Sequence, residues 1–309
     1  IPLRLVGSEM CIRDSPKAVT WVQVVGLACK IPLSVLFTFG AAGYAGWGLI
    51  GCAYATLVVN LLMAVFSILA LIKGDYRELH LWRRFEAPHL GRLFEMLRLG
   101  LPNAASITVE VTSYTLMALL IARLGSQSAA SHQITSNLGA LLYMVPLSVS
   151  IATSARVSYW IGAARPELAR AAIRHGFTWL LLTTLISGLV LALGRDVIAR
   201  LYIQDEAVAR QASDLLAWLV WYQTVDALQV LCFFVLRCYR VTLLPMLVYA
   251  TFLWGIGLSG GFWLAYVGGW GIEALMGPQA FWISSSLALT IVSALLGTLL
   301  WQVIRRERG

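Results

Sequence analysis

Residues 100–122 read GLPNAASITVEVTSYTLMALLIA, an apolar run with a single ionisable side chain, Glu110, near its centre. A helix that crosses the hydrocarbon core of a membrane needs about 20 such residues. Similar runs occupy most of the chain, which has 309 residues, 59% of them hydrophobic and 12% charged, and a mean hydropathy of +0.78. Soluble domains carry about 25% charged residues. The composition therefore excludes an ordinary soluble enzyme.

Eight apolar runs of this kind predict eight membrane-spanning helices and an all-α polytopic membrane protein. Most of the breaks between the runs are short and contain glycine, proline or charged residues, as in a compact bundle. The predicted spans are residues 18–39, 48–72, 100–122, 130–153, 173–194, 213–236, 243–266 and 280–303.

Two segments differ from these runs. Residues 1–15, IPLRLVGSEMCIRDS, are too polar for a signal-peptide core and are similar to translated sequencing-adaptor read-through. We interpret them as an artefactual leader and expect the natural protein to begin further upstream. Residues 73–99 are polar and predict a cytoplasmic linker. From Leu90 to Leu97 the apolar residues of this linker have helical spacing, which suits either an amphipathic helix at the membrane surface or a plain loop.

The basic residues predict the orientation in the membrane. With the linker inside, the inner loops carry 15 Lys and Arg and the outer loops carry 4. Because basic loops stay in the cytoplasm, the linker and the C-terminus are predicted to be cytoplasmic. The net charge of +8 follows the same bias and does not indicate a nucleic-acid partner. The inner set is Lys73, Arg77, Arg83, Arg84, Arg92, Arg98, Arg156, Arg165, Arg170, Arg174, Arg237, Arg240, Arg305, Arg306 and Arg308; the outer set is Arg123, Arg195, Arg200 and Arg210.

Three ionisable side chains, Lys30, Glu110 and Asp226, lie well inside the predicted spans. Each costs on the order of 2.5 to 3.5 kcal/mol at a helix centre and so is expected to have a compensating role. Glu110 and Asp226 each lie ten residues from the cytoplasmic end of their span, so both are about 15 Å deep. Two carboxylates at one depth suit a site for Na⁺ or a proton. The alternative is that each is protonated and joins helices by hydrogen bonds.

The neighbours of the two carboxylates support a cation site. A polar stripe at i, i+3, i+7 and i+10 spacing consists of Asn103, Ser106, Glu110 and Ser113. Tyr222 and Gln229 share a helix face with Asp226, and their oxygens are suitable cation ligands, although Tyr222 suits packing equally well. We therefore predict a cation site, with Na⁺ as one candidate ion, at Glu110, Asp226 and Tyr222. The predicted cavity-lining residues are Asn103, Ser106, Ser113, Gln229 and Asn137.

Other polar residues have two interpretations each. Lys30 either snorkels to the membrane surface or faces a cavity. His132, beside Gln133 at the outer start of the fourth span, is either a hydrogen-bonded helix-end residue or a proton relay. The chain has no metal-ligand spacing, phosphate-binding loop or nucleophile motif. We therefore expect neither a cofactor nor enzymatic activity.

Three stretches resemble the multidrug and toxic compound extrusion (MATE) family, in particular its bacterial NorM-like branch. Residues 99–170, from LGLPNAASITVEVTSYTL to SYWIGAARPELAR, are similar to the family's seventh and eighth helices. Residues 226–246, DALQVLCFFVLRCYRVTLLPM, are similar to the tenth helix, and residues 46–56, GWGLIGCAYAT, to the start of the sixth. Cys238 and Ser158 replace glycines that are usual in two of the family's motifs, so loop geometry is expected to depart from the family there.

The resemblance covers residues 17–309 and implies the architecture and the site. In that family two six-helix lobes make a twelve-helix fold, of which the eight spans here correspond to helices five to twelve. Residues 16–72 would then be the last two helices of the N-terminal lobe, residues 73–99 the inter-lobe linker and residues 100–309 the C-terminal lobe. Glu110 and Asp226 match the family's cation-site carboxylates, with Tyr222 one turn before Asp226.

The resemblance also implies a secondary active transporter rather than an enzyme. We expect a monomeric antiporter of a bacterial inner membrane that exports small organic cations, such as drugs or toxins, in exchange for Na⁺ or H⁺. One alternative is a lipid-linked saccharide flippase of the same superfamily, which would need several buried basic residues where this chain has only Lys30. A membrane-embedded enzyme is a second alternative, but the spans carry no cluster of His or Cys.

Overall fold

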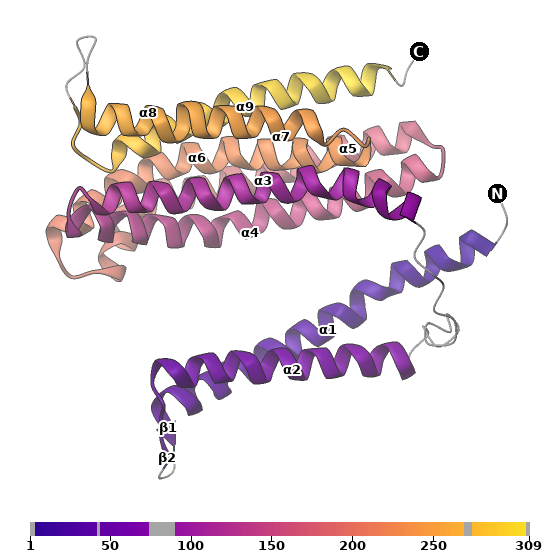
Figure 1. Cartoon of the computed structure of the whole chain (residues 1–309), viewed down its shortest axis with the longest axis horizontal. Helices are drawn as coiled ribbons and strands as arrows, with labels where there is room; N and C mark the ends of the chain where they lie inside the picture. Colours follow the sequence, from indigo (N-terminus) through magenta and orange to yellow (C-terminus); the bar gives the residue numbers. More distant parts are fainter. Residues whose placement is uncertain (1–3, 42–43, 74–89, 269–273, 307–309) are drawn as a thin grey trace. The chain divides into compact units, whose positions relative to one another are not determined.

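The computed structural model describes residues 4–41, 44–73, 90–268 and 274–306 (Figure 1). It divides into two compact units, Ile1–Pro88 and His89–Gly309. The division falls within the predicted linker, of which residues 74–89 lie outside the described residues, as do residues 1–3 of the predicted leader. The assignment of the units to the two lobes of a twelve-helix fold stays a prediction.

The first unit is a helical hairpin. Helix α1 (Arg4–Phe39) and helix α2 (Leu49–Lys73) pack against each other. The strands β1 (Gly40–Ala41) and β2 (Tyr44–Ala45) join them, with Gly40 paired to Ala45 in an antiparallel register. Gly48 has a positive φ of 58° directly before α2, a conformation that glycine adopts without strain.

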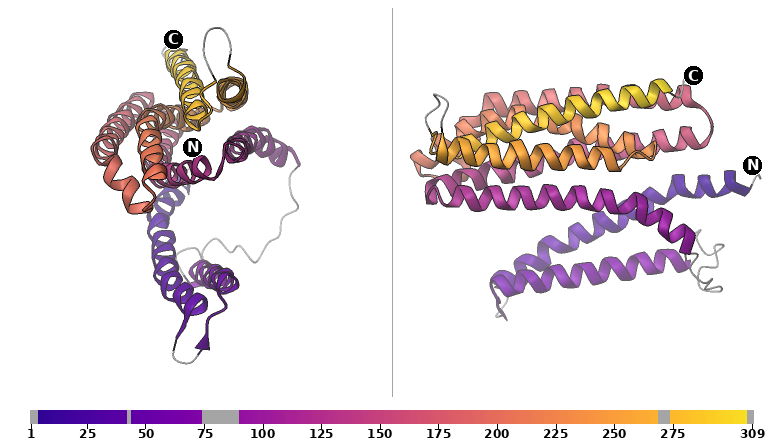
Figure 2. Two further views of the ribbon diagram at one scale, coloured as in Figure 1. Left: turned by 90° about the vertical axis from the view of Figure 1, so that its left-hand side faces the viewer. Right: turned by 45° about the horizontal axis from the view of Figure 1, so that its top comes forward.

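The second unit is a bundle of long helices that run roughly antiparallel (Figures 1 and 2). Three-residue connections join most of them. Because such a short loop returns the chain along the preceding helix, neighbouring helices are antiparallel. The elements are α3 (Leu90–Ala122), α4 (Ser126–Gly162), α5 (Pro166–Tyr202), α6 (Glu206–Cys238), α7 (Leu243–Phe252), η2 (Leu253–Leu258), α8 (Ser259–Phe262), η3 (Trp263–Val267) and α9 (Gln279–Arg306).

The eight predicted spans are confirmed, since the described residues contain 8 helical segments long and apolar enough to cross a membrane. The predicted bounds were too short, because α4, α5 and α6 have 37, 37 and 33 residues. Residues 156–162 and 195–202 belong to helices, not to the predicted breaks. A polar side chain ends an apolar run, but it leaves the backbone hydrogen bonds of the helix unchanged, so the helix continues past the hydrocarbon.

The helices begin and end for local reasons. Asp205 precedes α6 and its carboxylate accepts hydrogen bonds from the backbone N–H of Ala207 (2.9 Å) and Val208 (3.4 Å). Pro166 starts α5, where its missing N–H is not needed. Leu90 to Leu97, considered as a separate interfacial helix or a loop, form the first turns of α3.

Both residues that replace a family glycine lie within helices. Ser158 lies inside α4 and Cys238 is the last residue of α6, so both have helical backbone. Positive φ angles occur instead at Ala164 (54°) and Arg240 (59°), in the turns that follow the two helices. The expected departure in loop geometry stays a prediction.

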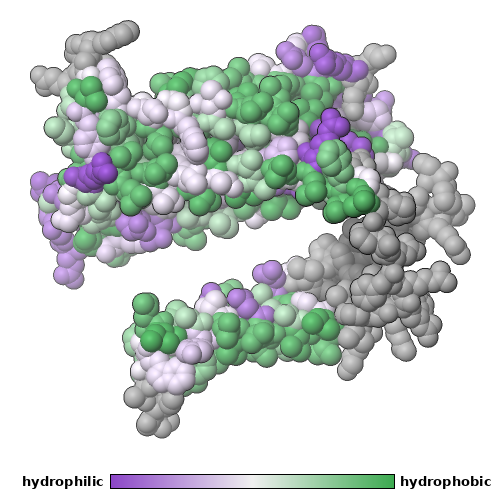
Figure 3. Space-filling model, in the orientation of Figure 1, coloured by the Kyte–Doolittle hydropathy of each residue, from purple (hydrophilic) through white to green (hydrophobic). Residues whose placement is uncertain are grey.

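Helix α6 is central to the second unit, where it packs against α4, α5 and α9. Among the described residues, apolar side chains from these helices, together with α3 and the span that contains α7, form two buried clusters. The outer face is also apolar: in Figure 3 hydrophobic residues cover the middle of the bundle, and hydrophilic residues gather toward its two ends. A surface of this kind suits a bilayer, with its polar headgroup layers at both ends of the helices.

Glycine allows α8 to approach α9 closely. A Cβ added at Gly261 would lie 2.6 Å from Cδ1 of Phe281 and 3.1 Å from its Cα, closer than packed atoms allow. Phe281 is fully buried, so its ring has little room to move. At Gly255, on the same span, an added Cβ would meet nothing within 4 Å.

We therefore expect Gly261→Ala to lower the free energy of unfolding by about 1–3 kcal/mol through overpacking. Gly255→Ala is the matched control and should leave stability nearly unchanged. Thermal unfolding of the purified chain in detergent, followed by circular dichroism, measures both. Equal melting temperatures for the two variants would contradict the close approach at Gly261.

Candidate functional site

Glu110 and Asp226 line one cavity inside the second unit, although they lie on different helices and far apart in the sequence. Glu110 projects from α3 and Asp226 from α6, and the cavity between them has a volume of about 210 Å³. Asp226 is buried, with 9% of its surface exposed. One water needs only about 10–15 Å³ measured in this way, so the cavity has room for a cation with water ligands.

Three helices each present one face to this cavity. Residues that point to the same side of a helix recur at intervals of three, four and seven, and the lining residues have these intervals. They are Glu110, Val111 and Tyr114 on α3, Ser136, Gly139, Ala140 and Tyr143 on α4, and Leu219, Tyr222, Gln223 and Asp226 on α6.

The polar groups of the lining are mostly oxygens. Glu110 and Asp226 contribute carboxylates, Tyr222 a phenol and Ser136 a hydroxyl. Gln223 donates a hydrogen bond from Nε2 to Oγ of Ser187 at 2.8 Å, and its buried Oε1 has no partner within the described residues. Oxygen ligands are the ones that hard cations prefer.

An aromatic cluster holds Tyr222 in place at the edge of the cavity. The Tyr222 ring meets Tyr114 at a centroid distance of 6.5 Å and Trp282 at 5.3 Å, both in T-shaped geometry. Tyr114 and Trp282 also contact each other at 6.4 Å. Such contacts fix ring orientation. The two interpretations of Tyr222, cation ligand and packing residue, are thus compatible, because its ring packs while the residue lines the cavity.

His132 belongs to the same cluster. It is buried at 3% exposure, with ring centroids 6.5 Å from Tyr114 and 5.9 Å from Trp282. Its Nε2 lies 3.2 Å from Oγ of Ser136, which lines the cavity, and its Nδ1 has no partner within the described residues. Both interpretations of His132, as a hydrogen-bonded helix-end residue and as a proton relay, stay predictions. Gln133 is exposed.

A second cavity, of about 340 Å³, shares Glu110 with the first. It contains three of the residues predicted to line a cavity, namely Asn103, Ser106 and Gln229. Arg237 donates a hydrogen bond from Nη1 to Oδ1 of Asn103 at 3.5 Å. Glu110 thus borders both cavities, and polar groups continue from it toward the start of α3.

The structure does not bring every predicted residue to these cavities. Ser113 is buried at 7% exposure but is not among the residues that line either of them. Asn137 is exposed, and its neighbour Ser136 lines the first cavity instead. Successive side chains on a helix differ in direction by about 100°, so Asn137 and Ser136 point to different sides of α4. Lys30 lies on an exposed side of α1 in the first unit.

Several lining residues were missed in the sequence, notably Tyr114, Tyr143 and Gln223. Tyr114 follows Glu110 by four positions, so its helical spacing was available as a signal. Gln223 is next to Tyr222, so helical spacing could also have identified it as a lining residue. Tyr143 comes from α4, whose predicted span carries no carboxylate, Lys or Arg, so only the packing of α4 against the other helices identifies it.

A sequence model of the MatE family matches residues 102–263. The chain is 37% identical over 295 residues to a protein of Aromatoleum aromaticum named "Probable multidrug resistance protein NorM", covering 95% of this chain and 64% of that protein. It is 34% identical to "Multidrug resistance protein NorM" of Vibrio vulnificus, covering 93% and 62%. The chain therefore spans slightly less than two thirds of the length of these relatives.

Solved structures with the same fold include the eukaryotic MATE transporter AtDTX14, with a TM-score of 0.79 at 22% identity, covering 93% of this chain and 63% of that one. An outward-facing multidrug resistance MATE transporter has the same TM-score at 15% identity, covering 93% and 62%. At these identities the likeness establishes the fold. The prediction of an all-α polytopic membrane protein of this fold is confirmed.

Proposed function

The chain belongs to the MatE family, and from that premise we propose that it is part of a cation-coupled multidrug antiporter in which Glu110 and Asp226 bind the coupling ion. The observation that carries this proposal is their position on one cavity, on helices that are distant in the sequence. Carboxylates in a membrane protein interior are costly, and a bound Na⁺ or proton offsets that cost.

The proposed transport cycle is an exchange between two states. Na⁺ or a proton enters the cavity of Glu110 and Asp226, favours the outward-open state and so lowers the affinity for the bound organic cation. Coupling of this kind requires only that each ligand binds the two states with different affinity. Because Glu110 borders both cavities, a change in its ionisation or ligation changes the electrostatic environment of both.

The charges around the two cavities favour this function over a lipid-linked saccharide flippase. Such a flippase would need several basic side chains to neutralise a pyrophosphate. The two cavities are lined by Glu110 and Asp226 but by a single basic residue, Arg237. An organic cation with a positive charge is therefore the better-matched substrate.

Substitution of the carboxylates tests the site in an intact transporter that carries this sequence. We expect Glu110→Gln and Asp226→Asn each to abolish drug resistance and efflux, because neither amide can exchange a cation or a proton. Glu167→Gln, which alters an exposed carboxylate outside both cavities, is the matched control and should retain transport. Membrane expression levels show whether each variant inserts. Unchanged efflux in an inserted Glu110→Gln or Asp226→Asn variant would refute the assignment.

Thermal unfolding in detergent distinguishes the two coupling ions. A ligand at 100 times its dissociation constant stabilises the folded state by about 2.7 kcal/mol, so saturating Na⁺ should raise the melting temperature if Na⁺ binds. Protons compete for the same oxygens, so the rise should shrink as the pH falls.

The Glu110→Gln, Asp226→Asn double variant supplies the control for the melting experiment. A Na⁺-dependent rise that is lost in this variant identifies Na⁺. A pH dependence without any Na⁺ effect, lost in the same variant, identifies protons. A Na⁺ effect of undiminished size in the double variant would place the ion elsewhere and contradict the proposal.

The transporter is proposed to act as a single chain in a bacterial inner membrane, with its C-terminus in the cytoplasm. The basis for the orientation is the excess of basic residues on one side of the helices. We expect a fluorescent protein fused after Gly309 to fluoresce, and alkaline phosphatase fused after Gln204 to be active outside. The reverse pattern would show that the orientation is inverted.

A further inference from the structure

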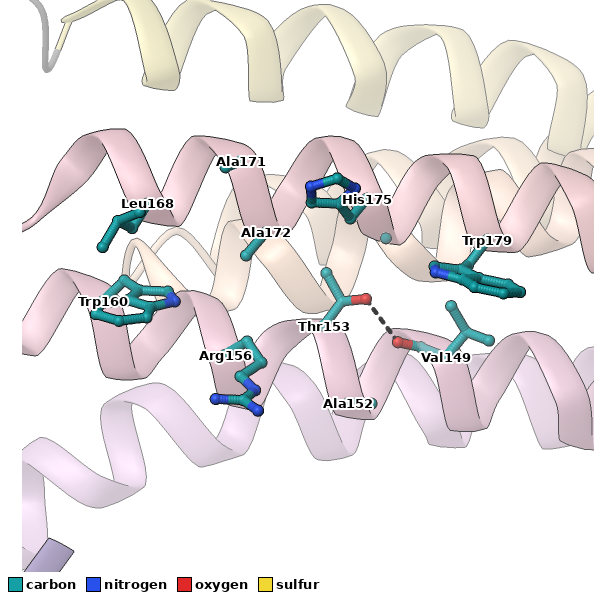
Figure 4. Close-up of a pocket in the computed structure, with 11 residues that line it drawn as sticks. Val149, Ala152, Thr153, Arg156, Trp160, Leu168, Ala171, Ala172, His175 and Trp179 are labelled. Carbon is teal, nitrogen blue, oxygen red and sulfur yellow. Dashed lines mark hydrogen bonds between the residues drawn. The ribbon is translucent and has the colours of Figure 1, made fainter. Parts of the chain in front are cut away.

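A groove of about 620 Å³ lies between α4 and α5, apart from the cavities that Glu110 borders (Figure 4). Small residues are prominent in its lining: Ala152 on α4, and Ala171, Ala172 and Gly176 on α5. Figure 4 shows Trp160 and Leu168 toward one end of the groove and Trp179 toward the other. Thr153 donates its hydroxyl hydrogen to the carbonyl oxygen of Val149 at 2.7 Å, which satisfies the main polar group of the groove floor.

The groove extends across the boundary between the headgroup layer and the hydrocarbon. Helices α4 and α5 each have 37 residues, about 55 Å, whereas the hydrocarbon is about 30 Å thick, so each end extends roughly 13 Å beyond it. Arg156 lies six residues before the end of α4, about 9 Å, and thus in the headgroup layer. Trp179 lies thirteen residues after the start of α5, about 20 Å, and thus in the hydrocarbon.

One side of α5 is open and apolar, as a lipid-facing surface is. The helix packs against α4 and α6, and its remaining face is apolar and open, with Trp179 58%, Leu185 72% and Leu189 58% exposed. Exposed apolar side chains at this depth are in contact with acyl chains in a membrane. A groove that opens on this face is therefore filled from the lipid phase.

The charge at the headgroup end selects an anion. Arg156 is exposed and has no ion pair within the described part of the chain, and across the groove His175 offers at least one ring N–H donor. The lining contains no carboxylate. A neighbouring hollow on α5 adds Arg170 and Arg174, with Glu167 as its one acid. A guanidinium binds phosphate oxygens in bidentate geometry.

We propose that this groove is a specific site for one anionic phospholipid, whose phosphodiester binds Arg156 and whose acyl chain lies along the hollow that ends at Trp179. The proposal depends on the fold and the membrane setting and not on the transport function. An organic cation is a poor occupant because Arg156 would repel it, and a zwitterionic lipid gains less from the arginines around the headgroup end.

Native mass spectrometry of the whole chain, delipidated in detergent, tests the proposal with two lipids that share their acyl chains, phosphatidylglycerol and phosphatidylcholine. We expect one phosphatidylglycerol per chain to be retained in preference to phosphatidylcholine. Arg156→Gln should weaken phosphatidylglycerol binding about tenfold, as expected for the loss of a charge-assisted hydrogen bond, and leave phosphatidylcholine binding unchanged. Arg123→Gln, an exposed arginine beyond the end of α3, is the matched control and should bind as the unaltered chain does.

A second variant separates the groove from surface charge. Ala152→Phe fills the hollow and keeps Arg156, so it should also weaken phosphatidylglycerol binding, and inorganic phosphate should not compete with the lipid. Circular dichroism of each variant confirms folding. Equal retention of the two lipids, full binding by Arg156→Gln or Ala152→Phe, or displacement of the lipid by tetraphenylphosphonium, an organic cation, would each overturn the proposal.

Discussion

The free-energy cost of a charged side chain in a low-dielectric interior constrains which groups can surround Asp226 in the second unit. Asp226 lies on α6, the helix that packs against α4, α5 and α9, and it is buried there. A carboxylate there is tolerated only if a cation, a proton or hydrogen-bond donors compensate it. The cavity with Glu110, Ser136 and Tyr222 supplies both the space and the oxygens for such compensation.

The rigidity of that cavity comes from apolar contacts. Tyr114, Tyr222 and Trp282 contact one another edge to face, and His132 packs against two of them. Aromatic rings in such arrangements have few alternative positions, so they hold the phenol of Tyr222 at the cavity edge at a small entropic cost. The polar site is thus positioned by packing between helices.

The two interior carboxylates and Arg156 occupy different places in the bundle. The carboxylates Glu110 and Asp226 lie in the interior, whereas Arg156 is exposed and lies near the end of α4. This separation follows from solvation, because a guanidinium near a helix end reaches water and phosphate, and an interior carboxylate reaches only its neighbours and its ion. The same bundle therefore offers a proposed cation site inside and a proposed lipid site outside.

The sequence by itself determined the number of spans and the two costly carboxylates, because hydrophobic length and buried charge are properties of single helices. Helical spacing also identified Asn103 and Ser106 as neighbours of Glu110. Only the tertiary structure decided that Ser136 and Tyr143 of α4 face that site, that Ser113 and Asn137 do not line it, and that α4 and α5 leave a groove. These depend on how the helices rotate and pack, which no single helix encodes.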